Sequence, residues 1–190
     1  MRKKEPKRWG IIFVTLFIAL SMILSIFAIV LDNQNNQLKY NGYKFSLTNE
    51  GYKVKVNDKI HTFKYYPSQL EIFNLSDDTK KLLSESVALA MVFNPNSSID
   101  DLAYIDYARF SFDEKIDKPV YFALTKESES YSLPVLGCEN ATSEIPFLLF
   151  NISTDTSIFT DGNCIVLNAK LLDIIAVEER IAYQMLGIMR

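Results

Sequence analysis

The longest apolar stretch of the chain lies near its N-terminus. Residues 10–31 form a run of 22 residues without a single charge. As an α-helix this run would be about 33 Å long at about 1.5 Å per residue, and a bilayer's hydrocarbon core is about 30 Å thick. The pattern therefore predicts a transmembrane helix over 10–31.

The hydrophobic period changes after this run. Residues 32–37 are all polar (DNQNNQ), and we interpret 32–42 as a linker. Then YKFSL, YKVKV and IHTFKYY alternate apolar and polar positions and are separated by the turn segments TNEG and NDK. Period-two runs joined by short turns are typical of antiparallel hairpins. They predict a three-stranded meander over 43–66, in which His61 and Phe63 share one face.

The remaining pattern mixes helices and strands. Ser76 and Ser98 are predicted N-caps of helices over 76–86 and 97–110, and Asp101 stands at capping-box spacing from Ser98. VALAMVF (87–93) has the continuous apolar character of a strand that is buried on both faces. Further strands are predicted at PVYFALT, PFLLFNI and CIVLNA. The order predicts an α+β domain over 43–190, with a mostly antiparallel or mixed sheet and two to three helices.

The C-terminal segment carries a helical apolar stripe that contains one acidic residue. Leu171, Ile174, Val177 and Ile181 recur at helical spacing, and Glu178 falls within the stripe. Either Glu178 pairs with a buried partner such as Arg109, or the helix begins near Val177 and Glu178 lies in its first turn. We favour the second interpretation.

The charges predict an orientation for the transmembrane helix. Residues 1–9 hold 5 of the 20 Lys and Arg residues and 1 of the 23 acidic residues, which leaves 15 against 22 in the rest of the chain. Basic residues beside a span favour the cytoplasmic side. The expected arrangement is a single-pass cell-membrane protein with a basic cytoplasmic segment at 1–9 and an extracytoplasmic domain. The acidic excess of that domain argues against nucleic acid as a partner.

Two other fates of the apolar run are compatible with its sequence. A cleaved secretory signal would have a shorter apolar region and a small-x-small site, and no Ala-x-Ala follows residue 31. A pilin-type leader could be cut after Gly10, although Thr15 stands where a pilin's helix has glutamate. We favour an uncleaved signal anchor. All three alternatives place residues 32–190 outside the cytoplasm.

Cys138 and Cys164 are the two cysteines of the chain. Exported proteins keep disulfides, so an even count favours one bridge between them, with two free thiols as the alternative. The bridge requires LPVLGC to lie beside the strand that begins at Cys164. His61 is the single histidine, and we interpret it as a surface or cross-strand residue. Catalysis by either cysteine and metal binding are therefore not expected.

No other motif predicts chemistry. The sequence lacks G-x-S-x-G, H-E-x-x-H and a phosphate-binding loop. It therefore predicts no catalytic residue, no metal site and no cofactor. Four N-x-[ST] triplets make their asparagines candidate N-glycosylation sites, namely Asn74, Asn96, Asn140 and Asn151.

Several segments carry a resemblance. GNCIVLN and ERIAYQMLGIM, with CENAT upstream and NGYKF after the apolar run, resemble a group of short single-span archaeal membrane proteins of unknown function. The resemblance implies an archaeal envelope setting and brings no activity with it.

The expected function is that of a membrane-anchored extracytoplasmic module that binds a protein partner or has a structural role. The lipid bilayer is its second expected partner. A pilin-like or other filament subunit is the alternative, and an extracytoplasmic enzyme is the third hypothesis.

Overall fold

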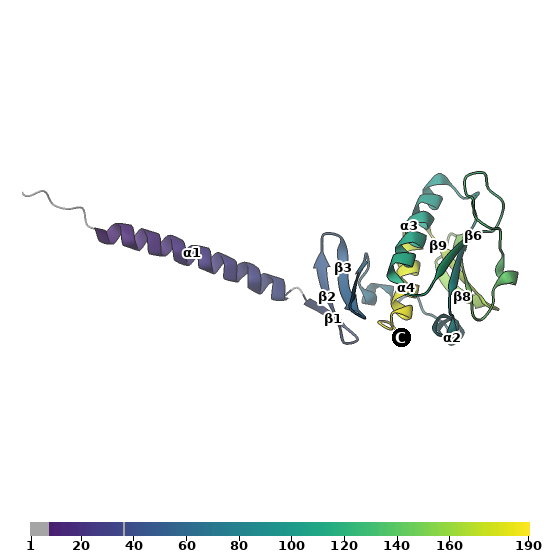
Figure 1. The fold of residues 1–190 in the computed structure, drawn as a ribbon, viewed down its shortest axis with the longest axis horizontal. Coiled ribbons are helices and arrows are strands. Elements are labelled where there is room, and N and C mark those ends of the chain that lie inside the picture. Colours follow the sequence, from purple (N-terminus) through teal and green to yellow (C-terminus); the bar gives the residue numbers. More distant parts are fainter. Residues whose placement is uncertain (1–7, 36) are drawn as a thin grey trace, which may run out of the picture. The chain divides into compact units, whose positions relative to one another are not determined.

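The computed structural model describes residues 8–35 and 37–190 (Figure 1). It divides into two compact units, Met1–Leu38 and Lys39–Arg190. Most of the predicted cytoplasmic segment, residues 1–7, lies outside the described residues. The second unit contains almost all of the strands and three of the four α-helices, so the α+β class is confirmed.

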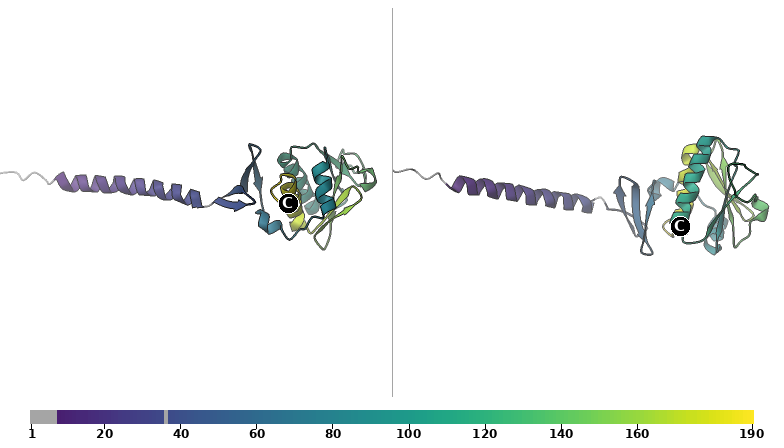
Figure 2. Two further views of the ribbon diagram at one scale, coloured as in Figure 1. Left: turned by 90° about the horizontal axis from the view of Figure 1, so that it is seen from below. Right: turned by 45° about the horizontal axis from the view of Figure 1, so that its top comes forward.

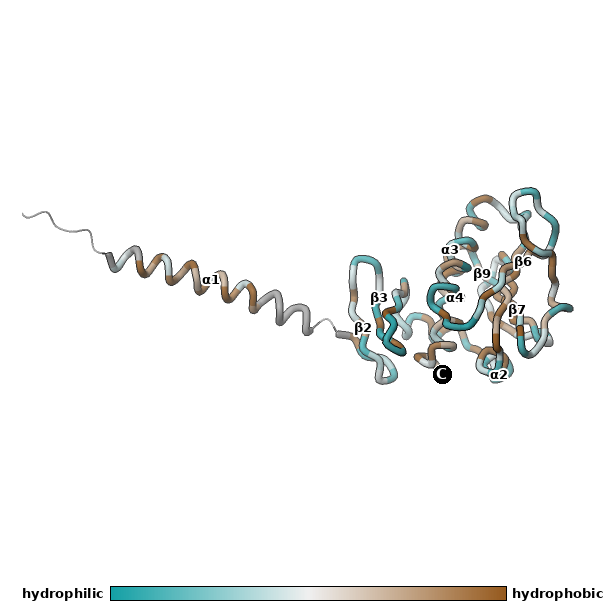
Figure 3. Tube along the Cα trace, viewed as in Figure 1, coloured by the Kyte–Doolittle hydropathy of each residue, from teal (hydrophilic) through white to brown (hydrophobic). Residues whose placement is uncertain are grey.

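The first unit contains helix α1, Arg8–Asn35. Its described side chains between Trp9 and Phe27 are exposed, and apolar positions recur along it (Figure 3). Within the described residues, no helix combines the length and the apolarity that crossing a membrane requires. The transmembrane helix over 10–31 thus stays a prediction. The segment interpreted as a linker holds the end of α1 and strand β1, Gln37–Tyr40.

A four-stranded sheet follows, in the order β1-β2-β3-β4. Strands β2 (Tyr43–Thr48), β3 (Gly51–Val56) and β4 (Lys59–Phe63) are antiparallel neighbours, so the predicted meander is confirmed. Asn57 and Asp58 form the two-residue turn between β3 and β4 and have positive φ angles of 48° and 65°. Both residue types tolerate this conformation.

A second sheet of five strands has the order β6-β5-β7-β9-β8. Its strands are β5 (Leu89–Phe93), β6 (Val120–Leu124), β7 (Phe147–Ile152), β8 (Ser157–Asp161) and β9 (Cys164–Ala169). β5 pairs in parallel with β6 and β7, and β7 pairs in parallel with β9, whereas β8 is antiparallel to β9. The sheet is mixed, as expected, but it is mainly parallel, and the sequence did not predict β8.

Three α-helices belong to the same unit as the two sheets. They are α2 (Asp77–Glu85), α3 (Ile99–Lys115) and α4 (Ile174–Met185). Short 3₁₀ turns cover Pro67–Leu70, Cys138–Asn140 and Leu171–Asp173. The predicted caps are confirmed, because Ser76 accepts the N–H of Thr79 and Ser98 accepts that of Asp101.

Helices α3 and α4 form a layer between the two sheets (Figures 1 and 2). α4 is therefore buried from both sides, from Ile174 through Tyr183 with the exception of Ile175. On the side of the four-stranded sheet, the Tyr183 ring stacks on Phe63 with 3.9 Å between centroids. A helix that is covered on every face must bury its polar residues too, and this position explains the charges described next.

Candidate functional site

A cluster of three buried charges lies between α3 and α4. Lys115 Nζ lies 3.2 Å from both carboxylate oxygens of Glu178 and 3.3 Å from Glu179 Oε1. Glu179 also accepts the backbone N–H groups of Lys64 and Tyr65, at 2.7 Å and 2.9 Å. The three charged residues are at most 5% exposed. The cluster therefore ties both helices to the end of β4.

The cluster places one cation against two carboxylates. Burial raises the pKa of Glu178 to about 8, although Lys115 opposes the shift. Burial also raises the pKa of Glu179, which Lys115 and the two backbone N–H groups partly offset. Burial alone would lower the pKa of Lys115, but the two carboxylates more than offset it and the pKa is raised. Near neutral pH the raised pKa of Glu178 favours a proton on that carboxyl group, beside the Lys115 ammonium.

The favoured interpretation of Glu178 was wrong. α4 begins at Ile174, so Glu178 lies beyond its first turn and is fully buried because α4 is covered on both sides. Its partner is Lys115, which the sequence did not single out. Arg109 pairs instead with Asp106, at 2.8 Å, and its guanidinium lies over the Phe110 ring, 4.3 Å from the centroid.

Of the two positions expected for His61, the cross-strand position is confirmed, opposite Val54, and the surface position is wrong. Its side chain is 3% exposed because β4 turns it toward the helices together with Phe63. Burial lowers the pKa of His61, which favours the neutral ring. Its Nδ1 has no hydrogen-bond partner among the described residues.

A groove lies between β4 and α3. One cavity of about 440 Å³ is lined by residues from the strand side and from α3, namely Glu50, Thr62, Lys64, Tyr107, Phe110, Ser111 and Glu114. A second cavity, of about 340 Å³, shares Lys64 and Tyr107 with the first and adds Ala103, Tyr104 and Ile175. We call these residues together the α3 groove. Tyr107 and Phe110 are 46% and 52% exposed, so aromatic surface is open to a ligand there.

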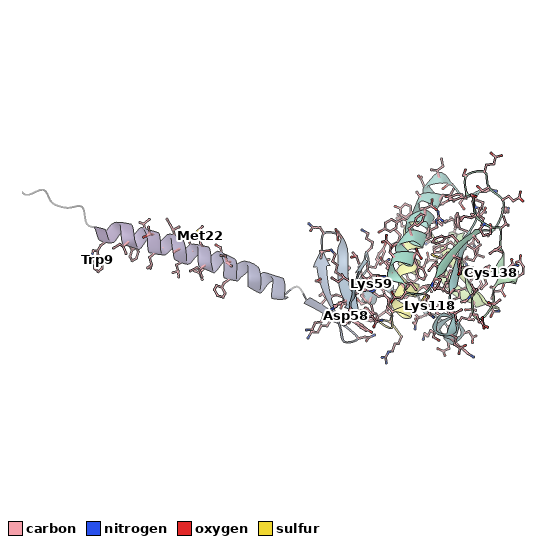
Figure 4. All side chains as sticks on the ribbon, in the orientation of Figure 1. Trp9, Met22, Asp58, Lys59, Lys118 and Cys138 are labelled. Atoms are coloured by element: carbon pink, nitrogen blue, oxygen red, sulfur yellow. A yellow bond between two sulfur atoms is a disulfide. The ribbon has the colours of Figure 1, made fainter. Side chains whose placement is uncertain are left out.

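The two cysteines lie on the face of the five-stranded sheet that α3 and α4 do not cover. Cys138 and Cys164 form a disulfide-capable pair, joined in the structure with their Cα atoms 5.3 Å apart, within the range that a disulfide requires. Cys138 lies on the side of the five-stranded sheet away from α3 and α4 (Figure 4). Leu136 and Ile145 contact a small apolar cluster on this face that includes Val92 and Phe147. The predicted neighbour of LPVLGC is confirmed only at Cys138, which lies beside Cys164 at the start of β9, because Val135 earlier in this segment bridges Leu124 of β6 instead.

The disulfide makes a testable contribution to stability. It closes a loop with a sequence separation of 26, which is worth about 3 kcal/mol in the chain-entropy model. We expect Cys138→Ser and Cys164→Ser to lower the melting temperature by similar amounts, and the double variant to lower it little further. Two reactive thiols in the unreduced, denatured wild-type protein would contradict the bridge.

The four asparagines of the glycosylation triplets are all exposed. Two of them use their side chains within the fold: Asn140 Oδ1 accepts the N–H of Gly137 at 3.0 Å, and Asn151 Nδ2 donates to Asn168 at 2.8 Å. Their exposure is compatible with glycosylation, which stays a prediction for all four.

No set of three His, Cys, Asp or Glu side chains that could hold a metal ion occurs in the part of the chain that the structure describes. Comparison with protein-family models, with curated proteins and with solved structures found no match. The geometry of the α3 groove is thus the main basis for a functional proposal.

Proposed function

We propose that the chain is a membrane-anchored module that holds its α+β domain outside the cytoplasm, where it binds a protein partner. The observation that carries the binding role is the α3 groove, which joins two cavities across exposed Tyr107 and Phe110. Ligand sites are typically concave and mainly apolar with a few polar groups, and this groove adds Thr62, Ser111 and Glu114 to its aromatic surface.

The sequence supports the membrane anchor. The uncharged run over 10–31 is preceded by a basic segment and is followed by a chain with excess acidic residues. An oxidising compartment outside the cytoplasm also suits a bonded Cys138 and Cys164. These features together favour an anchor over a helix that packs in the interior of a soluble protein.

Membrane extraction and mass spectrometry test the anchor together. We expect the chain to stay with membranes through alkaline carbonate washing and to have a mass that includes residues 10–31. Removal of residues 10–31 by deletion should release the domain from the membrane fraction. A mature protein that starts after Gly10 would favour a filament subunit, and release of the unmodified chain by carbonate would overturn the anchor.

A further inference from the structure

We propose that the partner binds as an extended segment that pairs with the free edge of β4 and places one apolar side chain in the α3 groove. This inference rests on the proposed binding function and adds the class of partner to it. The segment would become a fifth strand of the four-stranded sheet. Strand addition in a groove between an edge strand and a helix is a recurrent mode of peptide recognition.

The hairpin between β3 and β4 determines which backbone groups face the edge. Its two-residue turn makes Val56 and Lys59 the closing pair, which exchange hydrogen bonds in such hairpins. Hydrogen-bonded and non-hydrogen-bonded pairs then alternate, so Ile60 and Thr62 direct their N–H and C=O groups away from β3. Lys64 follows the same alternation, and its N–H indeed donates to Glu179.

The edge of β4 is open over a short length. Strand β4 is the last in the order of its sheet, and outside the sheet's own pairing no hydrogen bond among the described residues uses the backbone of Ile60 or Thr62. The Lys59–Asp117 ion pair, at 3.6 Å, stands at one end of the opening and Glu179 stands at the other. At about 3.3 Å per residue, an opening of this kind suits a segment of about four residues.

The charges of the groove indicate the chemistry of the segment. Glu114 is exposed and forms no ion pair with any described residue, whereas Glu50 pairs with Lys53 at 2.6 Å. The cation of the groove, Lys64, donates from Nζ to the Glu50 carbonyl oxygen at 3.1 Å. A lysine or arginine on the added segment would pair with Glu114 and contact the Tyr107 ring, because aromatic faces attract cations. The segment we infer therefore alternates cationic and apolar residues, which matches the acidic excess of the domain.

A defined probe tests the proposal on the full chain in detergent micelles. The probe is a short blocked peptide of alternating lysine and valine, and binding is followed by NMR through the backbone amides of the domain. We expect the largest shifts at Ile60 and Thr62. A matched peptide with N-methyl groups on alternate residues loses the pairing edge, so it should bind at least about tenfold more weakly.

Variants separate backbone pairing from simple charge attraction. Thr62→Pro removes an N–H that faces the free edge, a position where proline is compatible with a strand, and should weaken the probe about tenfold. Glu114→Gln should weaken it about threefold and reduce its salt dependence, as expected of an exposed charge pair. Asp113→Asn, an exposed neighbour outside the groove, is the matched control and should bind like the wild type.

The outcomes distinguish this inference from the proposed function. No binding of the probe, or binding that is indifferent to Thr62→Pro and to N-methylation, would overturn strand addition and leave the membrane anchor and the groove in place. A dimer of the protein alone that Thr62→Pro dissociates would also overturn it, because a second copy would then occupy the edge.

Discussion

Lys115→Met is expected to destabilise the domain by about 3–5 kcal/mol, the range found when one partner of a buried ion pair is removed. The variant leaves Glu178 and Glu179 in the interior without their cation, and Glu178 has no other ionic partner among the described residues. The loss includes the contact of Lys115 Nζ with the Phe63 ring, 5.0 Å from its centroid. Chemical denaturation at neutral pH measures the change in the free energy of unfolding.

The chain offers a matched control for this experiment. Lys59→Met makes the same chemical change in an ion pair whose two side chains are 48% and 62% exposed, and it should cost no more than about 1 kcal/mol. The double variant Lys115→Met/Glu178→Met should regain part of the loss, because it also removes the buried carboxyl group that the single variant leaves without its hydrogen-bond partner. Equal effects of Lys115→Met and Lys59→Met would contradict the buried cluster.

The stability of the domain is expected to fall with rising pH through the titration of Glu178. Its pKa is about 8 in the folded chain against an ordinary value of 4.5, so folding retains a proton that the unfolded chain releases. This stabilisation is complete below about pH 4.5 and is lost as the pH rises toward about 8, at about 1.4 kcal/mol per pH unit.

Glu178→Gln isolates that contribution, because glutamine has the shape of the protonated acid and does not titrate. The difference in free energy of unfolding between wild type and Glu178→Gln should change with this slope between about pH 5 and pH 8. A constant difference for Glu178→Gln would mean that Glu178 is ionised throughout.

Local signals in the sequence predicted the elements of this domain well. The alternation in YKVKV and IHTFKYY predicted the meander correctly, because a hairpin pairs two strands that follow each other directly in the sequence. Ser76 and Ser98 predicted the helix starts correctly, because an N-cap side chain accepts a backbone N–H only three residues further along the chain. The sequence missed β8, SIFTD, which is short and has only two large apolar residues.

Such local signals do not predict contacts between residues that are far apart in the sequence. Glu178 drew notice as an acid in an apolar stripe, but its partner Lys115 is 63 residues away on a helix whose pairing with α4 no pattern reveals. The same holds for the α3 groove, where Thr62 and Tyr107 meet only because α3 lies beside the edge of β4. His61 was misplaced in part because period-two alternation defines two faces and does not say which one is buried.

The orientation of the chain in the membrane is the central claim, and tag accessibility tests it most directly. One epitope tag is fused before Met1 and, in a second version, after Arg190, and impermeant antibody is added to intact cells and to lysed cells. The account predicts that the tag after Arg190 is reached on intact cells, whereas the tag before Met1 is reached only after lysis. A tag after Arg190 that becomes accessible only on lysis would contradict it.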